Sequence, residues 1–303
     1  MHETTSSVLP HHSGVVAVIG PPNAGKSTLL NRCLEQKIAI VTPLPQTTRN
    51  RIQGILTGEN WQMLLLDTPG LHKAKETINK EMVRIAMEAL AEADVVLLLA
   101  DASDGRREKR REEYLAWLER VRCPVVLALN KTDLVSREQQ LPLIEWHSAL
   151  HPFAAVVPIS ALSGEGVQEL LRELVSRLPE GPQYYPADMP TDSTERFIAA
   201  ELIREKIFLR TQQEVPYSTA VLIDAFQEDV EKGQAVIHAT ILVERDSQKG
   251  ILIGKNGAML GSIRKSATKE IEEMLGCKAQ LRLFVKVRKG WTENAQILRE
   301  LGM

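Results

Sequence analysis

The chain has 303 residues, enough for about two domains that each bury a core. Its 37 Lys and Arg residues against 39 Asp and Glu give a formal net charge of -2 at pH 7, so the composition as a whole does not indicate a nucleic-acid-binding protein. Residues 1–13 are polar, and the longest apolar runs are strand-sized, so we expect no signal sequence and no membrane-spanning helix. The cysteines lack metal-ligand spacing, which indicates core packing in a reducing compartment rather than a zinc site: Cys33, Cys123 and Cys277.

A glycine-rich loop follows the first apolar run, which covers residues 15–19. The loop fits the pattern Gly-x-x-x-x-Gly-Lys-Ser/Thr, in which glycines allow backbone N–H groups to turn toward a diphosphate. Lys26 supplies a cation to the outer phosphates, the Ser27 hydroxyl can bind magnesium, and a helix that we expect to open at Thr28 adds its positive end. The strand before the loop makes a chance turn a much weaker explanation. The predicted phosphate-binding residues are Gly20, Pro21, Pro22, Asn23, Ala24, Gly25, Lys26, Ser27 and Thr28.

A second motif, Asp-Thr-Pro-Gly, follows the apolar strand predicted over residues 61–66. Asp67 ends that strand, where its carboxylate can hold magnesium through water. The Gly70 N–H can sense the γ-phosphate, and Thr68 and Pro69 complete the nucleotide-binding segment. Such a segment alone is more typical of an ordinary turn, so the prediction depends on its place after the phosphate loop.

Two later loops are predicted to hold the base. The Asn-Lys-x-Asp motif follows the apolar run 124–129, and its last carboxylate can accept hydrogen bonds from both N1 and the exocyclic N2 of guanine. Adenine offers no such pair of donors, so the motif predicts GTP rather than ATP. A Ser-Ala-Leu segment after residues 155–159 can support O6 of the base through its backbone. The predicted base-binding residues are Asn130, Lys131, Thr132, Asp133, Ser160, Ala161 and Leu162.

The segment between the phosphate loop and Asp67 contains Gln-Thr-Thr-Arg and two prolines, which indicates a loop. A threonine that binds magnesium only when the γ-phosphate is present is the expected form of a nucleotide switch. We choose Thr48 over Thr47 as this ligand. An ordinary polar loop is the alternative.

Strands alternate with helical patterns through residues 15–178, which predicts an α/β domain with a mostly parallel sheet. We expect helices over residues 75–91 and 106–120, and a hairpin over 51–66 that adds one antiparallel strand. Four prolines within residues 179–190 interrupt any regular element and predict a linker over 179–192. The expected organisation is a polar tail over 1–14, a nucleotide-binding domain over 15–178, the linker, and a second domain over 193–303.

The pattern of the second domain predicts, in order, a helix (193–210), a strand (218–226), a strand (235–244), two helices around residues 254–275, and a strand (279–287). The Gly-x-x-Gly turn between the two helices is the arrangement with which a type II KH domain clamps single-stranded nucleic acid. Residues 249–289 carry ten Lys or Arg against three acids. The alternative is a simple helix–helix turn in a module that binds protein rather than RNA, with the basic stretch only a solvated face. The predicted RNA-binding residues are Gly254, Lys255, Asn256, Gly257, Lys286, Arg288 and Lys289.

Taken together, these motifs and the tail from residues 284 to 302 resemble the Era family of bacterial GTPases almost from end to end. The resemblance implies an α/β P-loop GTPase domain followed by an α+β KH domain, with GTP or GDP and Mg²⁺ as ligands. It implies binding to the 3′ end of 16S ribosomal RNA and a role in 16S rRNA processing and small ribosomal subunit biogenesis. It also implies a cytoplasmic location and allows peripheral contact with the inner membrane. We expect a monomer.

The residue after the Asp-Thr-Pro-Gly motif is Leu71, where many GTPases have a glutamine that orients the attacking water. Leucine cannot position water, so we expect slow intrinsic hydrolysis. Asn23 resembles the phosphate-loop asparagine that binds a potassium ion in related GTPases, although an asparagine in a tight turn also has structural uses. The predicted catalytic residues are Asn23, Lys26, Thr48 and Gly70.

Overall fold

The computed structural model describes residues 10–45, 47–70, 77–229 and 233–301. Contacts divide the chain into two compact units. Unit 1 comprises Met1–Gln36, Gln53–Thr68 and Met87–Asp192. Unit 2 comprises Lys37–Ile52, Pro69–Ala86 and Ser193–Met303, so it contains two stretches that precede the linker as well as everything after it.

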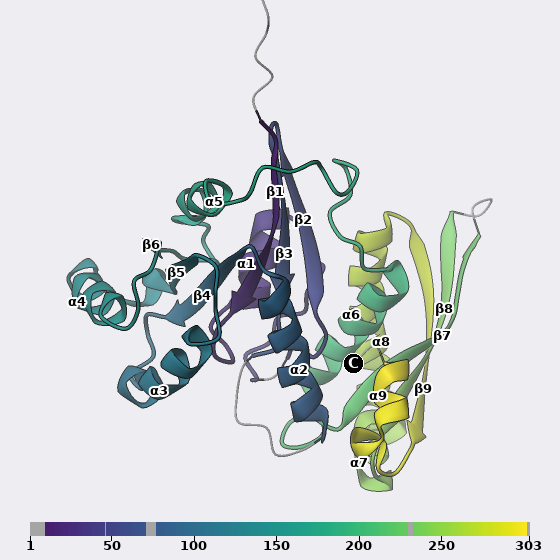
Figure 1. Ribbon diagram of the computed structural model, residues 1–303. Helices are drawn as coiled ribbons and strands as arrows, with labels where there is room; N and C mark the ends of the chain where they lie inside the picture. The colour runs from purple at the N-terminus through teal and green to yellow at the C-terminus, as the bar shows by residue number, and fades with distance from the viewer. Residues whose placement is uncertain (1–9, 46, 71–76, 230–232, 302–303) are drawn as a thin grey trace, which may run out of the picture. The chain divides into compact units, whose positions relative to one another are not determined.

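Unit 1 is built around a six-stranded sheet in the order β2-β3-β1-β4-β5-β6 (Figure 1). Strand β1 pairs in parallel with β3 and β4, and β4–β5 and β5–β6 are also parallel. A two-residue connection joins β2 to β3, which requires that pair to be antiparallel. The predicted fold class is confirmed. The strands are β1 His12–Ile19, β2 Ile52–Gly58, β3 Trp61–Asp67, β4 Val95–Asp101, β5 Val125–Asn130 and β6 Ala155–Pro158.

Continuous apolar runs place the central strands between helices, because strands buried on both faces show no alternation of polar and apolar residues. All six residues of β5 are buried, as are the first six of β4. The carboxyl ends of β1, β3 and β5 therefore lie at one edge of the sheet, where the predicted motifs begin. The helices of unit 1 are α1 Lys26–Leu34, α3 Arg107–Leu118, α4 Arg137–Ser148 and α5 Val167–Val175. Helix α2, Thr77–Glu92, begins in unit 2 and ends in unit 1.

Residues 179–192 form no helix or regular strand and are fastened along unit 1. The backbone N–H of Ile55 donates to the carbonyl oxygen of Pro190 at 2.8 Å, and the Thr191 hydroxyl donates to the carbonyl oxygen of Gln53 at 2.6 Å. The Gln62 side chain donates to the carbonyl oxygen of Tyr185 at 2.9 Å. The proline-rich segment thus lies against the β2–β3 hairpin.

The C-terminal part of unit 2 has the order of elements expected for a KH domain. Its sheet has the order β7-β8-β9, in which β7 and β8 are antiparallel and β8 and β9 are parallel. Helices α6, α7 and α8 pack on one face of this sheet (Figure 1). The KH prediction is confirmed. The elements are α6 Glu195–Arg210, β7 Thr219–Asp229, β8 Gln234–Val243, α7 Asp246–Ile253, α8 Ala258–Leu275 and β9 Lys278–Val287.

The C-terminal tail packs on part of the other face. Trp291 is fully buried and donates its indole N–H to the carbonyl oxygen of Ser218 at 3.1 Å. It forms a cluster with Ala220 and Leu242 of the sheet and with helix α9 (Ala295–Glu300), which Asn294 caps. Sequence periodicity did not predict this six-residue helix, because so short an element shows less than two turns of pattern.

Within the described part of the chain, every helix is too short or too polar to span a bilayer.

Candidate functional site

The phosphate loop connects β1 to α1 and depends on unusual backbone angles. Gly20 has φ 153° and Gly25 has φ 99°, and a Cβ at these positions would lie 2.4 Å from the carbonyl oxygen of Leu99 and 2.3 Å from the Asn130 side chain. Asn23 also has positive φ, at 64°. Helix α1 begins at Lys26, two residues before the expected start at Thr28, because Gly25 already provides the left-handed N-cap. The first turn has no side-chain cap, so its N–H groups remain suited to phosphate.

Lys26 is 6 % exposed and donates to the carbonyl oxygens of Gly20 at 3.0 Å and Pro21 at 3.1 Å. Burial lowers the pKa of its ammonium to about 8, and the negative charge of Asp67 opposes this shift. The loop therefore holds a cation that lacks full solvation, and a phosphate can restore the charge stabilisation that burial removes.

Two oxygen groups suited to magnesium lie together beside this loop. The Ser27 hydroxyl donates to Oδ2 of Asp67 at 2.6 Å, and Asp67 is fully buried at the end of β3. Thr68 donates its hydroxyl to the carbonyl oxygen of Val18 at 2.7 Å, which ties the start of the Asp-Thr-Pro-Gly segment to β1. A hydroxyl and a carboxylate at this spacing fit the oxygen ligands that Mg²⁺ prefers.

Asn130 connects the phosphate loop to the predicted base loop. Its amide donates to the carbonyl oxygen of Ala24 at 2.7 Å, and its side-chain oxygen accepts the backbone N–H of Ala161 at 2.9 Å. Asn130 is 2 % exposed, so both bonds are shielded from water. The first residue of the Asn-Lys-x-Asp motif thus holds two parts of the site in register.

The other residues of the predicted base loop lie close to Asn130 in the chain. Lys131 has φ 66° and donates to Asp101 at 2.6 Å, while Asp133 lies in a 3₁₀ turn with an exposed carboxylate. Thr132 donates its backbone N–H to the carbonyl oxygen of Ile159 at 3.2 Å. The exposed Asp133 carboxylate is open to a ligand, and its pairing with guanine stays a prediction.

The Ser-Ala-Leu loop is held from the phosphate-binding side by Arg32 of α1. Nε of Arg32 donates to the carbonyl oxygen of Ala161 at 3.3 Å, and its Nη2 donates to that of Leu162. Ser160 is fully buried and its hydroxyl accepts the N–H of Ser163 at 3.2 Å. The sequence prediction did not include Arg32, since an arginine in a first helix has no motif of its own.

Thr48, Pro69 and Gly70 belong to unit 2, so their predicted contact with nucleotide and magnesium stays a prediction. Leu71 lies outside the described residues. Thr48 is buried, and the residues on both sides of it contact the C-terminal part of unit 2. Thr47 and Arg49 of this motif are thus hydrogen-bonded to residues more than 150 positions further along the chain.

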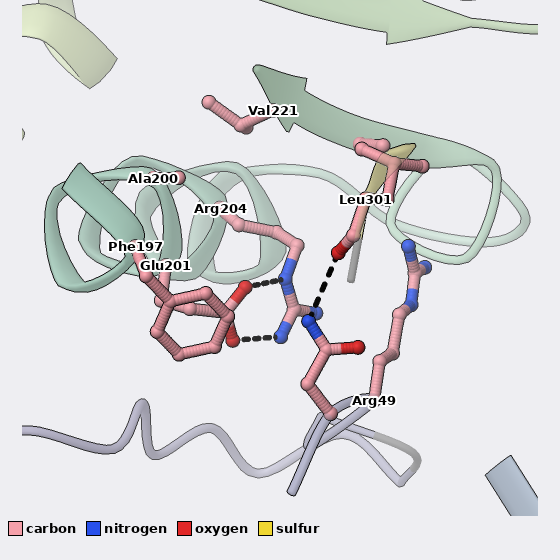
Figure 2. Close-up of a pocket in the computed structure, with 9 residues that line it drawn as sticks. Arg49, Phe197, Ala200, Glu201, Arg204, Val221 and Leu301 are labelled. Atoms are coloured by element: carbon pink, nitrogen blue, oxygen red, sulfur yellow. Dashed lines mark hydrogen bonds and ion pairs between the residues drawn. The ribbon is translucent and has the colours of Figure 1, made fainter. Parts of the chain in front are cut away.

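Arg204 of α6 holds the residue before Thr48. Its guanidinium donates to both carboxylate oxygens of Glu201, at 2.7 and 2.5 Å, and to the carbonyl oxygen of Thr47 at 2.6 Å. Figure 2 shows the paired Glu201 and Arg204 side chains, with Arg49 nearby. The pair is buried, so removing one partner would leave the other charged and desolvated.

Arg49 holds the residue after Thr48. Its guanidinium donates to three backbone carbonyl oxygens before and at the start of β7, those of Pro216 at 3.2 Å, Tyr217 at 2.7 Å and Thr219 at 2.8 Å. Its central carbon lies 6.0 Å from the ring centres of two aromatic residues, Phe208 and Trp291. Five N–H donors on a planar group suit this set of acceptors.

At the start of the stretch of unit 2 that contains Thr48, Lys37 donates to Glu205 at 2.7 Å and to Glu270 at 2.8 Å. Lys206 contacts the same two carboxylates. Burial opposes ionisation of Glu270, but the hydrogen bonds from Lys206 and Lys37 outweigh it and hold its pKa below the usual range. Glu205 also accepts the backbone N–H of Val41 at 3.0 Å, so α6 fixes this end of the segment too.

A small cavity of about 50 Å³ lies beside the arginines, and Figure 2 shows residues that line it. Among the described residues, Nη1 of Arg204 and Oδ1 of Asn50 are buried without a hydrogen-bond partner. A polar cavity of this size can hold ordered water that satisfies both groups. The Asn50 amide donates to the carbonyl oxygen of Leu301 at 3.1 Å, which ties the segment to the C-terminal tail.

The Gly-x-x-Gly turn between α7 and α8 has three residues with positive φ: Gly254 at 71°, Asn256 at 53° and Gly257 at 77°. A Cβ at Gly254 would lie 2.7 Å from that of Met259, so the first glycine is required by close packing. Lys255 and Asn256 are exposed at the tip. Helix α8 begins directly after Gly257 without a side-chain cap, which leaves its N-terminal N–H groups suited to phosphate.

The remaining predicted RNA-binding residues lie elsewhere in the module. Lys286 is exposed on β9, and Arg288 and Lys289 are exposed just after that strand. Lys286 pairs in register with Leu242, which belongs to the sheet face that the tail partly covers, whereas α7 and α8 pack on the opposite face. The structure therefore does not group Lys286 with the Gly-x-x-Gly turn.

Comparison with known proteins identifies the family. The family model described as 50S ribosome-binding GTPase matches residues 15–131, and the KH domain model matches residues 214–292. The chain is 50 % identical to the GTPase Era of Geobacter metallireducens over 97 % of this chain and 98 % of that protein. It is also 50 % identical to the GTPase Era of Syntrophus aciditrophicus over 96 % of this chain and 94 % of that protein. The chain belongs to the Era family of GTPases.

Solved Era structures agree with this assignment. A crystal structure of Era in complex with MgGDPNP and nucleotides 1506–1542 of 16S ribosomal RNA matches with a TM-score of 0.92 at 40 % identity, covering 96 % of this chain and 99 % of that chain. A variant of Aquifex aeolicus Era bound to GDP·AlF₄⁻ matches with the same TM-score at 39 % identity, covering 96 % and 99 %. The family recognised from the sequence motifs is confirmed.

Proposed function

We propose that this Era-family GTPase is a nucleotide-controlled switch that hydrolyses GTP and binds the 3′ end of 16S ribosomal RNA through its KH module. Its role is in 16S rRNA processing and small ribosomal subunit biogenesis. The proposal extends to this chain what the matched structure describes for another Era, which was crystallised with MgGDPNP and a 16S rRNA fragment.

The proposed nucleotide binding depends on one observation, the two hydrogen bonds of the Asn130 side chain. It joins Ala24 of the phosphate loop to Ala161 of the base loop, so one buried side chain sets the distance between the triphosphate and guanine subsites. A site built in this way is pre-organised before ligand arrives, which reduces the entropic cost of binding.

Ser27 and Asp67 are the residues of unit 1 that fit magnesium, Ser27 as a direct ligand and Asp67 through water. The ion would neutralise charge on the β- and γ-phosphates when bound. Lys26 contributes a second positive charge from a buried position, and its two carbonyl partners in the loop keep it in place. Thr48 and Gly70 are the proposed sensors of the γ-phosphate.

The RNA half of the proposal is tested by replacing Lys255 and Asn256 with Asp, which puts two carboxylates at the tip of the turn. RNA affinity for a 16S 3′-end oligonucleotide should collapse, because phosphate contacts there become repulsive. Intrinsic GTP hydrolysis should stay within a few-fold of the parent in the same preparation. Equal RNA affinity in variant and parent would favour the alternative, a module that binds a protein partner.

Potassium is proposed as a further cofactor through Asn23, whose positive φ shows that the loop backbone is turned at this residue. Hydrolysis should then be faster in potassium than in sodium at equal ionic strength, and Asn23→Ala should remove the difference. Turnover that does not depend on the cation would assign Asn23 to the turn geometry alone.

A cytoplasmic location and a monomeric state belong to the same proposal. Peripheral contact with the inner membrane stays a prediction from the family resemblance.

A further inference from the structure

The outer face of the KH sheet, opposite α6, α7 and α8, is open along its edge strand. Residues of β8 at positions 235, 237, 239, 241 and 243 are fully buried, so they define the face that the helices cover. Their register partners on β9 are at odd positions, and the even positions of β9 therefore point to the other face. The outward residues of β9 are all exposed: Lys278, Gln280, Arg282, Phe284 and Lys286.

The C-terminal tail covers only part of this outer face. Trp291, Ile297 and Leu298 pack against Ala220 of β7 and Leu242 of β8. Phe284 is paired in register with Thr240, which lies two residues before the covered Leu242 on β8. Its side chain is 58 % exposed. A large aromatic side chain thus stands uncovered in the middle of an edge strand.

Cations flank this aromatic residue on the same face. Arg282 and Lys286 are its outward neighbours two residues before and after it, and neither pairs with a carboxylate among the described residues. Residues 278–289 contain five Lys or Arg and no acid. The ion pairs of this stretch with acids lie at its ends, where Glu272 is 3.8 Å from Lys278 and Glu300 is 3.8 Å from Arg288. One further carboxylate, Asp224 of β7, accepts a hydrogen bond from the hydroxyl of Thr240 at 2.7 Å.

We propose that the outer face of β9 is a second single-stranded RNA contact, in which Phe284 stacks on a base while Arg282 and Lys286 bind the flanking phosphates. An exposed aromatic ring between cations on a sheet surface is the chemistry with which proteins hold unpaired nucleotides. The contact is separate from the Gly-x-x-Gly turn, which follows α7 on the helical face. The inference rests on the proposed RNA binding of this module and extends the RNA path around its edge strand.

The test measures binding of the full chain to a fluorescent RNA with the sequence of its own 16S rRNA 3′ end. Phe284→Ala should weaken binding about tenfold, because one stacked base is lost, whereas Phe284→Tyr should stay within twofold of the parent. Since Phe284 is mostly solvent-exposed, the alanine variant should keep the parent's unfolding midpoint and GTP hydrolysis rate.

Electrostatic contacts are tested by replacing Arg282 and Lys286 together with Gln. The slope of log affinity against log salt concentration should fall by about 1.4, which corresponds to two phosphates of a single strand. Arg172→Gln is the matched control, because Arg172 is an exposed cation of α5 in unit 1 and should leave the slope unchanged. Ultraviolet cross-linking followed by mass spectrometry should identify Phe284 in a peptide joined to RNA.

Equal affinities for the parent, Phe284→Ala and Phe284→Tyr proteins would overturn the inference, as would an equal fall in salt slope for Arg172→Gln. These outcomes leave the proposed function intact if the Asp variant of the Gly-x-x-Gly turn still loses RNA. A parent protein that binds no RNA would instead overturn the proposed function, and the inference with it.

Discussion

The phosphate loop and the Gln-Thr-Thr-Arg segment are two parts of one predicted nucleotide site, but different units hold them. The phosphate loop is fixed within unit 1 by Asn130, while its lysine bonds to the loop's own carbonyl groups. The segment around Thr48 is fixed within unit 2 by Arg49 and Arg204, which bond it to the KH module. The groups predicted to bind the constant parts of the nucleotide therefore belong to unit 1, without the RNA-binding module. The proposed γ-phosphate sensor is not.

The largest effect expected from this comparison is on unit 1. Lys26→Ala should weaken GTP binding about a thousandfold, because charged hydrogen bonds to phosphate are lost from a buried position. Isothermal titration with GTP measures the change. Lys109→Ala, which removes an exposed cation of α3, should leave affinity within twofold. A loss of less than tenfold for Lys26→Ala would show that the loop backbone binds phosphate without this lysine.

The next largest effect is expected for Arg204, which fixes the segment around Thr48 within unit 2. Arg204→Ala should lower the free energy of unfolding by about 3 kcal/mol, since Glu201 is left buried without its partner. GDP affinity should stay within twofold, because Asn130 fixes the phosphate and base loops without unit 2.

Urea denaturation and a GDP titration on the same protein check both halves of this prediction. The double variant Glu201→Leu with Arg204→Met should recover much of the stability, because neither charge remains. A large loss of GDP affinity in Arg204→Ala would contradict the separation of the two regions.

Asp133→Asn should weaken GTP binding about a hundredfold and improve binding of xanthosine triphosphate, because Asn presents a donor where guanine also donates and xanthine accepts. Competition between the two nucleotides measures the exchange. Because Asp133 is exposed, the substitution should not change the unfolding midpoint. Unchanged preference for GTP would remove Asp133 from the base subsite.

The smallest effect is a pH dependence that sharpens the role of Lys26. Its pKa is lowered to about 8 in the protein without nucleotide, and phosphate binds the charged form. GDP affinity should therefore fall as pH rises above 8, to about one tenth of its pH 7 value at pH 9. Lys26→Met provides the reference, since it retains only the titration of the nucleotide itself. An identical pH profile in both proteins would place the ammonium's pKa above 9.

Much of this site could be predicted because its parts are local motifs. The phosphate loop, Asp67 and Asn130 each end a strand or open a helix, and parallel strands bring such ends to one edge. The contacts of Arg32, Arg49 and Arg204 could not be predicted, because each connects distant segments through carbonyl groups that every residue carries. Lys286 is separated from the Gly-x-x-Gly turn because successive side chains of β9 point to opposite faces of the sheet. The sequence does not show which of the two faces the helices cover.

The hydrogen bonds of Arg49 have a consequence for how the chain folds during synthesis. Its carbonyl partners lie 167 to 170 residues later, so the segment around Thr48 leaves the ribosome long before the residues that hold it. The bonds within the phosphate loop form between near neighbours, but this segment must wait for a loop closure of high contact order. The nascent protein should thus acquire a phosphate loop well before it acquires a fixed position for its proposed magnesium-binding threonine.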